Sequence, residues 1–176
     1  MATETQKPQQ STDDCQMMAK PQQEHHWLHQ LVGEWSYEGS CEGGPNQPPM
    51  QFNGVEAVRS IGGLWIQAEG KGTSPDGSEM TSILNVGFDM RKKHYVGSWI
   101  CSVMDHMFVY EGKLDSAQKV LPLETEGPSF MEPGKTARYR DILEFVSPDH
   151  RVMRSEIQGD DGKWIQMFKA DYKRVK

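Results

Sequence analysis

The chain has 176 residues, of which 25 are acidic and 19 are basic, and its formal net charge is −6. This length fits a single domain, and the acidic balance argues against a nucleic-acid binder, which concentrates Lys and Arg to neutralise phosphates. No run approaches the ~18 apolar residues of a membrane span, and the N-terminal region lacks the basic start and apolar run of a secretory signal. We therefore expect a cytoplasmic protein with neither a nucleic-acid nor a membrane partner.

The N-terminal segment differs in composition from the rest of the chain. It is rich in Gln, Thr, Ser, Pro and Lys and has almost no large aliphatic residues. Such a segment cannot bury enough surface to offset its ordering entropy, so we expect residues 1–23 to form a disordered tail. A single folded domain then spans residues 24–176. At its start, Trp27, Leu28 and Leu31 lie at helical spacing and predict a two-turn helix that ends at Gly33.

From residue 33 onward the pattern is typical of an all-β protein. Short runs of aromatic, β-branched and Leu residues are interrupted every ~8–14 residues by turn-forming clusters. Nine such clusters predict ten strands, and they lie at residues 43–49, 62–63, 74–77, 89–92, 105–106, 115–116, 127–134, 147–149 and 159–162. These short links make neighbouring strands antiparallel. Because an open up-and-down sheet would leave two exposed edges, we expect about ten strands closed into a barrel.

The motif Gly33-Glu34-Trp35 lies between the predicted helix and the first strand. A Trp in this place can cap the closed end of a barrel, and the Gly allows the helix backbone to approach the strand. A leading helix, this motif and nine further strands resemble the calycin superfamily of lipocalin-like barrels. The runs at 26–35, 62–65, 97–100, 109–112 and 134–141 resemble the bacterial family designated domain of unknown function 1579. That family has no established activity, so the resemblance implies a lipocalin-like barrel and no particular reaction.

Aromatic residues in the strand runs are candidate walls of a ligand cavity. Small barrels of this strand number can enclose one small ligand, and Trp65, Trp99, Tyr110 and Tyr139 are suitable wall material. The alternative is that these side chains simply fill a solid core. The sequence leaves both interpretations open.

Charged residues within the same runs are candidates for orienting contacts. Glu56 and Glu69 would each need a partner or a ligand if they faced the interior. Trp65 and Glu69 share strand parity, so an inward Trp65 would bring Glu69 inward as well. The alternative is that both carboxylates face solvent. Arg140, like Arg138, could pair with these acids or bind an anionic head group, or form cross-strand pairs at the surface.

His106 is the strongest single titratable candidate because it lies at a predicted barrel rim between apolar residues. It could act as a proton donor, a proton acceptor or a metal ligand, or be a structural histidine held by hydrogen bonds. Together with Glu69 or Glu56 it could form the acid–base pair of a cavity enzyme. His25 and His29 share a helix face, but no carboxylate completes a metalloprotease-like pattern, so we expect no metal site.

Three cysteines, Cys15, Cys41 and Cys101, are widely separated and are expected to be reduced thiols. We expect no cofactor. Haem binding, as in the nitrobindin relatives of the superfamily, is disfavoured because they place an axial His on a late strand and residues 164–172 contain none.

The leading hypothesis is a module that binds a small, largely hydrophobic molecule in a barrel cavity. The contacts would come from Glu56, Trp65, Glu69, Trp99, His106, Tyr110, Tyr139 and Arg140. The alternatives are the cavity enzyme, with His106 and Glu69 as catalytic candidates, and a structural or homodimeric module, because apolar residues occur on both strand faces.

Overall fold

A computed structural model describes residues 19–42, 48–73 and 77–176. One helix, α1 (Gln23–His29), precedes ten strands. The strands are β1 (Gly33–Cys41), β2 (Met50–Ile61), β3 (Trp65–Thr73), β4 (Glu79–Asp89), β5 (His94–Cys101), β6 (Phe108–Gly112), β7 (Val120–Pro128), β8 (Thr136–Ser147), β9 (His150–Gln158) and β10 (Trp164–Arg174). The predicted tail over residues 1–23 falls mostly outside the described residues, as do Cys15 and parts of the turns predicted at 43–49 and 74–77.

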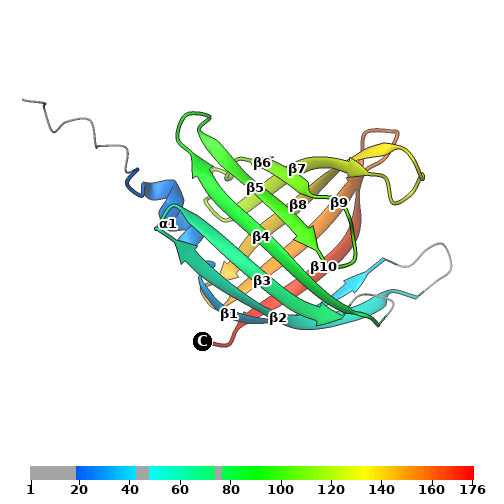
Figure 1. Ribbon diagram of the computed structural model, residues 1–176, viewed down its shortest axis with the longest axis horizontal. Coiled ribbons are helices and arrows are strands. Elements are labelled where there is room, and N and C mark those ends of the chain that lie inside the picture. The colour runs from blue at the N-terminus through cyan, green and yellow to red at the C-terminus, as the bar shows by residue number, and fades with distance from the viewer. Residues whose placement is uncertain (1–18, 43–47, 74–76) are drawn as a thin grey trace, which may run out of the picture.

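The strands form a closed antiparallel barrel in which each strand pairs with the next and β1 pairs with β10 (Figure 1). This confirms the predicted all-β class, the ten-stranded up-and-down order and the short leading helix. Closure gives both the first and the last strand a second neighbour, as the sequence argument required, and the shortest ladder is the two-residue pairing of β6 with β7. The part of the chain that the structure describes contains no helix long and apolar enough to cross a bilayer.

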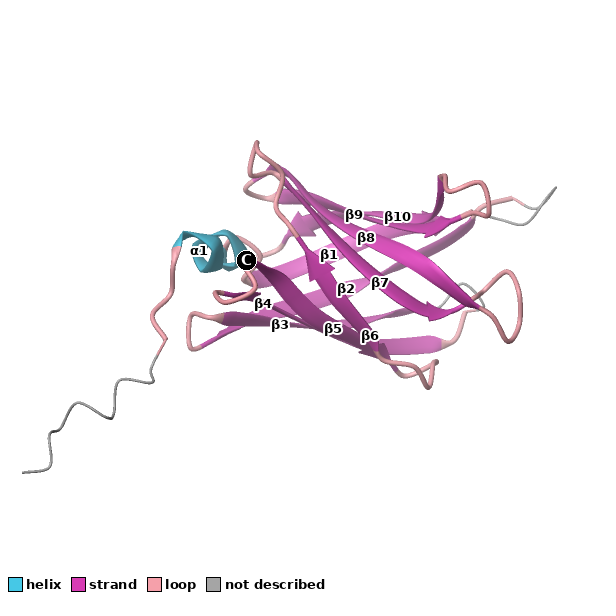
Figure 2. Cartoon of the chain, turned by 90° about the horizontal axis from the view of Figure 1, so that it is seen from above, coloured by secondary structure: helices cyan, strands magenta, loops and turns pink. Residues whose placement is uncertain are grey.

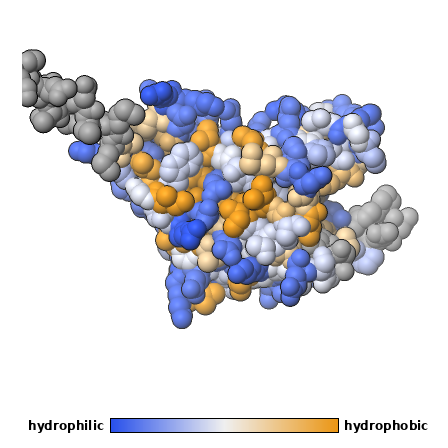
Figure 3. Space-filling model, viewed as in Figure 1, coloured by the Kyte–Doolittle hydropathy of each residue, from blue (hydrophilic) through white to orange (hydrophobic). Residues whose placement is uncertain are grey.

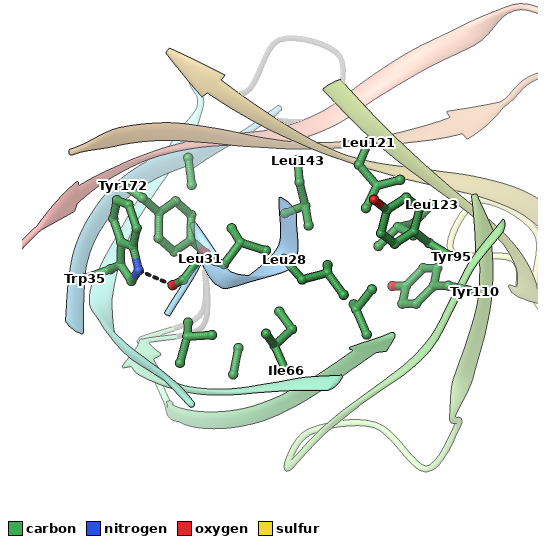
Figure 4. Close-up of a cluster of buried hydrophobic side chains, with 14 of the residues drawn as sticks. Leu28, Leu31, Trp35, Ile66, Tyr95, Tyr110, Leu121, Leu123, Leu143 and Tyr172 are labelled. Carbon is green, nitrogen blue, oxygen red and sulfur yellow. Dashed lines mark hydrogen bonds between the residues drawn. The ribbon is translucent and has the colours of Figure 1, made fainter. Parts of the chain in front are cut away.

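Helix α1 covers one end of the barrel, and the C-terminus lies beside it (Figure 2). We call this the closed end, and the opposite end, reached by the loops at residues 102–107 and 129–135, the open end. Leu28 and Leu31 point into the barrel and are almost fully buried (Figure 4). The Trp27 indole donates a hydrogen bond to the Gln118 carbonyl at 2.9 Å, which ties the helix to the segment before β7. The helix therefore acts as an apolar plug.

The motif predicted to cap the barrel does so through Trp35. Its indole N–H donates to the Leu31 carbonyl at 2.8 Å, and the guanidinium carbons of Arg151 and Arg174 lie 4.7 and 4.2 Å from the centroid of its ring. Arg174 also donates to the Val32 carbonyl just after α1 at 2.7 Å. A Cβ at Gly33 would lie 2.5 Å from Arg174, and Gly33 has a φ of +135°, so a glycine is needed there. The motif thus joins the helix to the first and last strands.

Candidate functional site

The inner face of the barrel is filled unevenly. Toward the closed end most inward side chains are buried, and Ile66, Leu121, Leu143 and Tyr95 pack around the helix, whereas Phe88 and Phe145 are partly buried there. Nearer the middle and the open end, several inward side chains keep exposed area although they point into the barrel. They are Phe52, Ser82, Leu84, Trp99, Ala137, Asp141 and Met153. Exposed area on an inward side chain requires adjacent free space, so this part of the inner face is not packed solid.

A pocket of about 560 Å³ lies at the open end. It is lined by the β5–β6 loop from Ser102 to His106 and by Phe108, Pro128 and Phe130. The His106 ring meets Phe108 edge-on with ring centroids 4.8 Å apart. Its Nε2 atom is buried and has no hydrogen-bond partner among the described residues. His106 is therefore at the rim, as predicted, with one imidazole nitrogen left unpaired.

Of the four predicted wall aromatics, Trp99, Tyr110 and Tyr139 face the interior of the barrel. Trp99 is the half-buried member, and its ring centroid lies 5.9 Å from that of Phe108. Tyr110 and Tyr139 face inward but are buried. The Tyr139 hydroxyl donates to the Pro128 carbonyl at 2.6 Å and accepts from the Phe130 amide at 3.2 Å, so it anchors the β7–β8 loop. Their inward placement agrees with the prediction, and ligand contact by these residues stays a prediction.

Trp65 and Glu69 do share one face, but it is the outer face, so placing them on the inner wall is wrong. Ile66 and Ala68 between them are buried inside the barrel. Trp65 is 41% exposed and its ring covers Gly87 of the neighbouring strand. Glu69 pairs with Lys71 at 3.0 Å in solvent. Such exposed apolar side chains on the outer surface are interspersed with polar ones (Figure 3).

Arg140 also lies on the outer face, which corrects its predicted role inside a cavity. It forms an ion pair with Glu156 of β9 and stacks on Trp164, with the guanidinium carbon 4.4 Å from the ring centroid. Arg138 pairs with Glu124 of β7 at 2.9 Å. These are the cross-strand surface pairs of the alternative interpretation.

Glu56 faces inward and is already neutralised by a residue that the sequence did not single out. Its carboxylate forms an ion pair with Arg151 of β9, whose side chain is almost fully buried. The Arg151 guanidinium lies against Tyr172 at 3.8 Å, and its Nε atom has no partner among the described residues. Burial and the nearby Glu56 carboxylate raise the pKa of Tyr37. The interior therefore holds a compensated ion pair surrounded by aromatic rings.

A second interior polar group is centred on Asp141 of β8, which was also missed. The Tyr110 hydroxyl donates to its Oδ2 at 2.5 Å, and the Ser155 hydroxyl donates to the same carboxyl group. Burial raises the pKa of Asp141, although both hydrogen bonds oppose the shift. Burial and the adjacent carboxylate together raise the pKa of Tyr110 well above its usual range. The alternation of Tyr139, Asp141 and Leu143 along one strand was the available sign that Asp141 faces inward.

The proposed acid–base pair is not assembled. Glu69 lies outside the wall and pairs with Lys71, whereas Glu56 is occupied by Arg151. His106 has no hydrogen bond from Nε2 to either carboxylate. Combining His106 with Glu69 in one cavity is therefore wrong, because the barrel wall separates an outward side chain from the interior.

A family model described as "Protein of unknown function (DUF1579)" matches residues 20–174. The chain belongs to this family. Among curated proteins, none matches the DUF1579 chain in sequence. Its barrel is similar to the crystal structure of Rv2717c from M. tuberculosis, with a TM-score of 0.62 and 11% identity, covering 89% of this chain and 100% of that one. It is also similar to the S-type phycobiliprotein lyase CPES from Guillardia theta, with a TM-score of 0.57 and 16% identity, covering 89% and 99%. At these identities the likeness concerns the fold alone.

The histidines of the DUF1579 barrel bear on the sequence expectations about metal and haem. In the described ranges, no three His, Cys, Asp or Glu side chains are placed together to hold a metal ion. His25 Nδ1 instead accepts a hydrogen bond from the Gln22 amide at 2.9 Å, within the first turn of α1. Strand β10 buries Ala170 and Tyr172 and carries no histidine, so it offers no imidazole as an axial haem ligand.

Proposed function

We propose that this DUF1579 protein binds one small, largely apolar molecule inside the barrel, on its open-end side. The observation that carries the proposal is the exposed area left on inward side chains, including Phe52, Leu84 and Trp99. Apolar surface that borders an internal space gains about 25 cal/mol per Å² when an apolar ligand covers it. A mostly apolar wall with a few polar groups is the usual composition of small-molecule sites.

The geometry supports entry from the open end. Helix α1 and the buried layer beneath it seal the other end. The mouth pocket, with apolar side chains from Met104, Phe108 and Phe130, lies where a ligand would arrive. The unpaired Nε2 of His106 offers a polar contact at this rim. Under this proposal, His106 contributes to binding and is not required to transfer a proton.

The test uses the uncharged dye N-phenylnaphthylamine, which becomes fluorescent in apolar surroundings. We expect saturable binding to the full chain with one site per molecule. Ala137→Trp places a large ring on the half-buried inner face and is expected to abolish the signal. The matched control is Val109→Trp, because Val109 is on an adjacent part of the barrel but points outward and is 57% exposed.

Thermal unfolding of each variant establishes that it is folded before dye is added. Ser82→Phe provides a second blocking variant at another inward position, should Ala137→Trp fail to fold. Absence of saturable dye binding by the wild-type chain would overturn the proposal. So would undiminished binding by both folded blocking variants, because the dye would then sit elsewhere.

Self-association is a second proposal, independent of the cavity. Apolar side chains such as Ile61, Trp65 and Ile100 lie on the outer face and are each more than 40% exposed. A homodimer would cover such area, and exposed apolar surface commonly marks interfaces. Sedimentation velocity over a range of concentrations tests it: a dimer that Ile100→Lys dissociates supports this role, and a monomer at every concentration contradicts it.

A further inference from the structure

Asp141 places a carboxyl group on the inner face of the barrel at a residue that is not fully buried. It lies midway along β8, between the inward residues Tyr139 and Leu143, and pairs across the sheet with Ser155. Its carboxyl group is desolvated, while the residue as a whole is partly and not fully buried on the inner face of the barrel. A carboxyl group in this position borders the internal space that the proposed ligand would occupy.

Asp141 also lacks a compensating cation. Among the described residues it takes part in no ion pair, and the contacts that influence its pKa are hydroxyl groups. The buried Arg151 is committed to Glu56. An unpaired carboxylate in an apolar surrounding is costly, and a positive charge brought to it would remove part of that cost. The unpaired Asp141 carboxylate would therefore attract a bound cation and repel a bound anion.

The hydrogen-bonding capacity of Asp141 is only partly used. A carboxylate has two oxygens with about four acceptor positions, and Tyr110 and Ser155 occupy two of them. Aromatic rings line the route toward the open end, where Phe108 lies 5.7 Å from Tyr139 and 5.9 Å from Trp99, centroid to centroid. Rings of this kind accommodate both an apolar body and a nearby cation.

We infer that the ligand carries a protonated amine, or a comparable cationic hydrogen-bond donor, which pairs with Asp141 while its apolar body contacts the inner wall. This inference rests on the proposed function. It makes the site selective: amines are favoured over alcohols of the same shape, and carboxylates are rejected by charge repulsion. Asp141 is the residue that determines this specificity, and Tyr110 and Ser155 hold its carboxylate in place.

The test compares three probes with one ring system, namely naphthylmethylamine, naphthylmethanol and naphthoate, by titration calorimetry near neutral pH. We expect the amine to bind the wild-type chain about tenfold more tightly than the alcohol, with the carboxylate weakest. Asp141→Asn should lower amine affinity to that of the alcohol and leave alcohol affinity within about twofold. Glu111→Gln, an exposed change next to Tyr110 but on the outer face, is the matched control and should keep the preference.

The outcomes separate the two proposals. If none of the probes binds saturably to the folded wild-type chain, both the proposed function and this inference fail. If amine and alcohol bind equally well, or if Asp141→Asn retains the full amine preference, binding stands and only the inference is overturned. Asp141→Thr, whose β-branched side chain suits a strand, replaces Asp141→Asn should the latter not fold.

Discussion

The two ends of this barrel are built differently. The closed end has an apolar helix inserted into it, with Leu28 and Leu31 among buried aliphatic and aromatic side chains. It also holds Trp35 with the guanidinium group of Arg174, the last residue of β10, against its ring. Toward the open end, inward side chains such as Trp99 remain half-buried, and a pocket of about 560 Å³ opens between loops. The closed end is filled by side chains of the protein itself, whereas the open end keeps space that a ligand could occupy.

This difference suggests that the closed end stabilises the fold and that the open end serves ligand binding. Burial and packing at the closed end supply stability, since removal of well-packed side chains is costly. The open side leaves apolar wall uncovered, which forfeits stability in the free protein and becomes useful only when a ligand covers it. The contrast predicts that substitutions toward the closed end affect unfolding strongly, while those near the open end affect unfolding less and binding more.

The largest effect is expected from breaking the interior ion pair. Arg151→Leu leaves the Glu56 carboxylate buried without its partner and should lower the free energy of unfolding by about 3–5 kcal/mol, measured by denaturant titration. The double variant Glu56→Gln with Arg151→Leu should recover most of this loss. A double variant no more stable than Arg151→Leu would show that packing against Trp35 and Tyr172, and not charge, sets the cost.

Removing part of the helix plug should be nearly as damaging. Leu28 is 1% exposed, so Leu28→Ala should cost about 3 kcal/mol in the same measurement, because it leaves a cavity under α1. The comparison at the open end is Phe130→Ala. Phe130 is 57% exposed, and its loss should cost less than about 1 kcal/mol. Equal costs at the two positions would contradict the division between the ends.

A smaller loss of folding stability is expected from removing the hydrogen bonds that anchor the β7–β8 loop at the open end. Tyr139→Phe removes the hydroxyl that donates to the Pro128 carbonyl and accepts from the Phe130 amide. The loss should be about 1 kcal/mol. Hydrogen exchange should quicken at the Phe130 amide while amides of α1 stay protected. Faster exchange in α1 would mean that the two ends do not open independently.

The smallest effect is expected in the pH dependence of folding stability, compared between Asp141→Asn and the wild-type chain. Because burial raises the pKa of Asp141 in the folded state, the protonated carboxyl stabilises the fold at low pH. That stabilisation is lost as pH rises through the folded pKa. Relative to wild type, Asp141→Asn should therefore gain stability with rising pH. The pKa values of the neighbouring Tyr110 and Tyr172 are raised by burial, so these two phenols stay neutral while Asp141 titrates.

Glu111→Gln should show the opposite slope in the same thermal unfolding series. Hydrogen bonding and the charge of Lys92 lower the pKa of Glu111, so its contribution is lost as pH falls. Slopes of the same sign for Asp141→Asn and Glu111→Gln would contradict the interior assignment of Asp141.

The sequence predicted the architecture better than the site. Turn clusters and up-and-down order are local signals, and they led correctly to a closed barrel with Trp35 at its cap. The alternation of side chains along a strand correctly placed Trp65 and Glu69 on the same face of β3. It could not tell whether that face is the inner or the outer face of the barrel. That choice depends on neighbours: Ile66 and Ala68 fill the interior, and Trp65 packs over Gly87 of β4.

Charged residues inside strands posed the harder problem. Asp141 and Arg151 resemble ordinary outward polar residues in an alternating strand, and their partners lie on other strands. The pairing of Arg151 with Glu56 joins residues 95 positions apart. Such a contact follows from barrel closure and register, which a linear pattern does not contain.

The seam between β1 and β10 has a consequence for how the protein is made. Trp35 pairs with Arg174, so the first strand finds its second neighbour only in the last one. During vectorial synthesis the edge of β1 stays unpaired until β10 has left the ribosome. Any premature stop that removes the final strand would deprive the nascent chain of its closing partner and leave an edge available for aggregation.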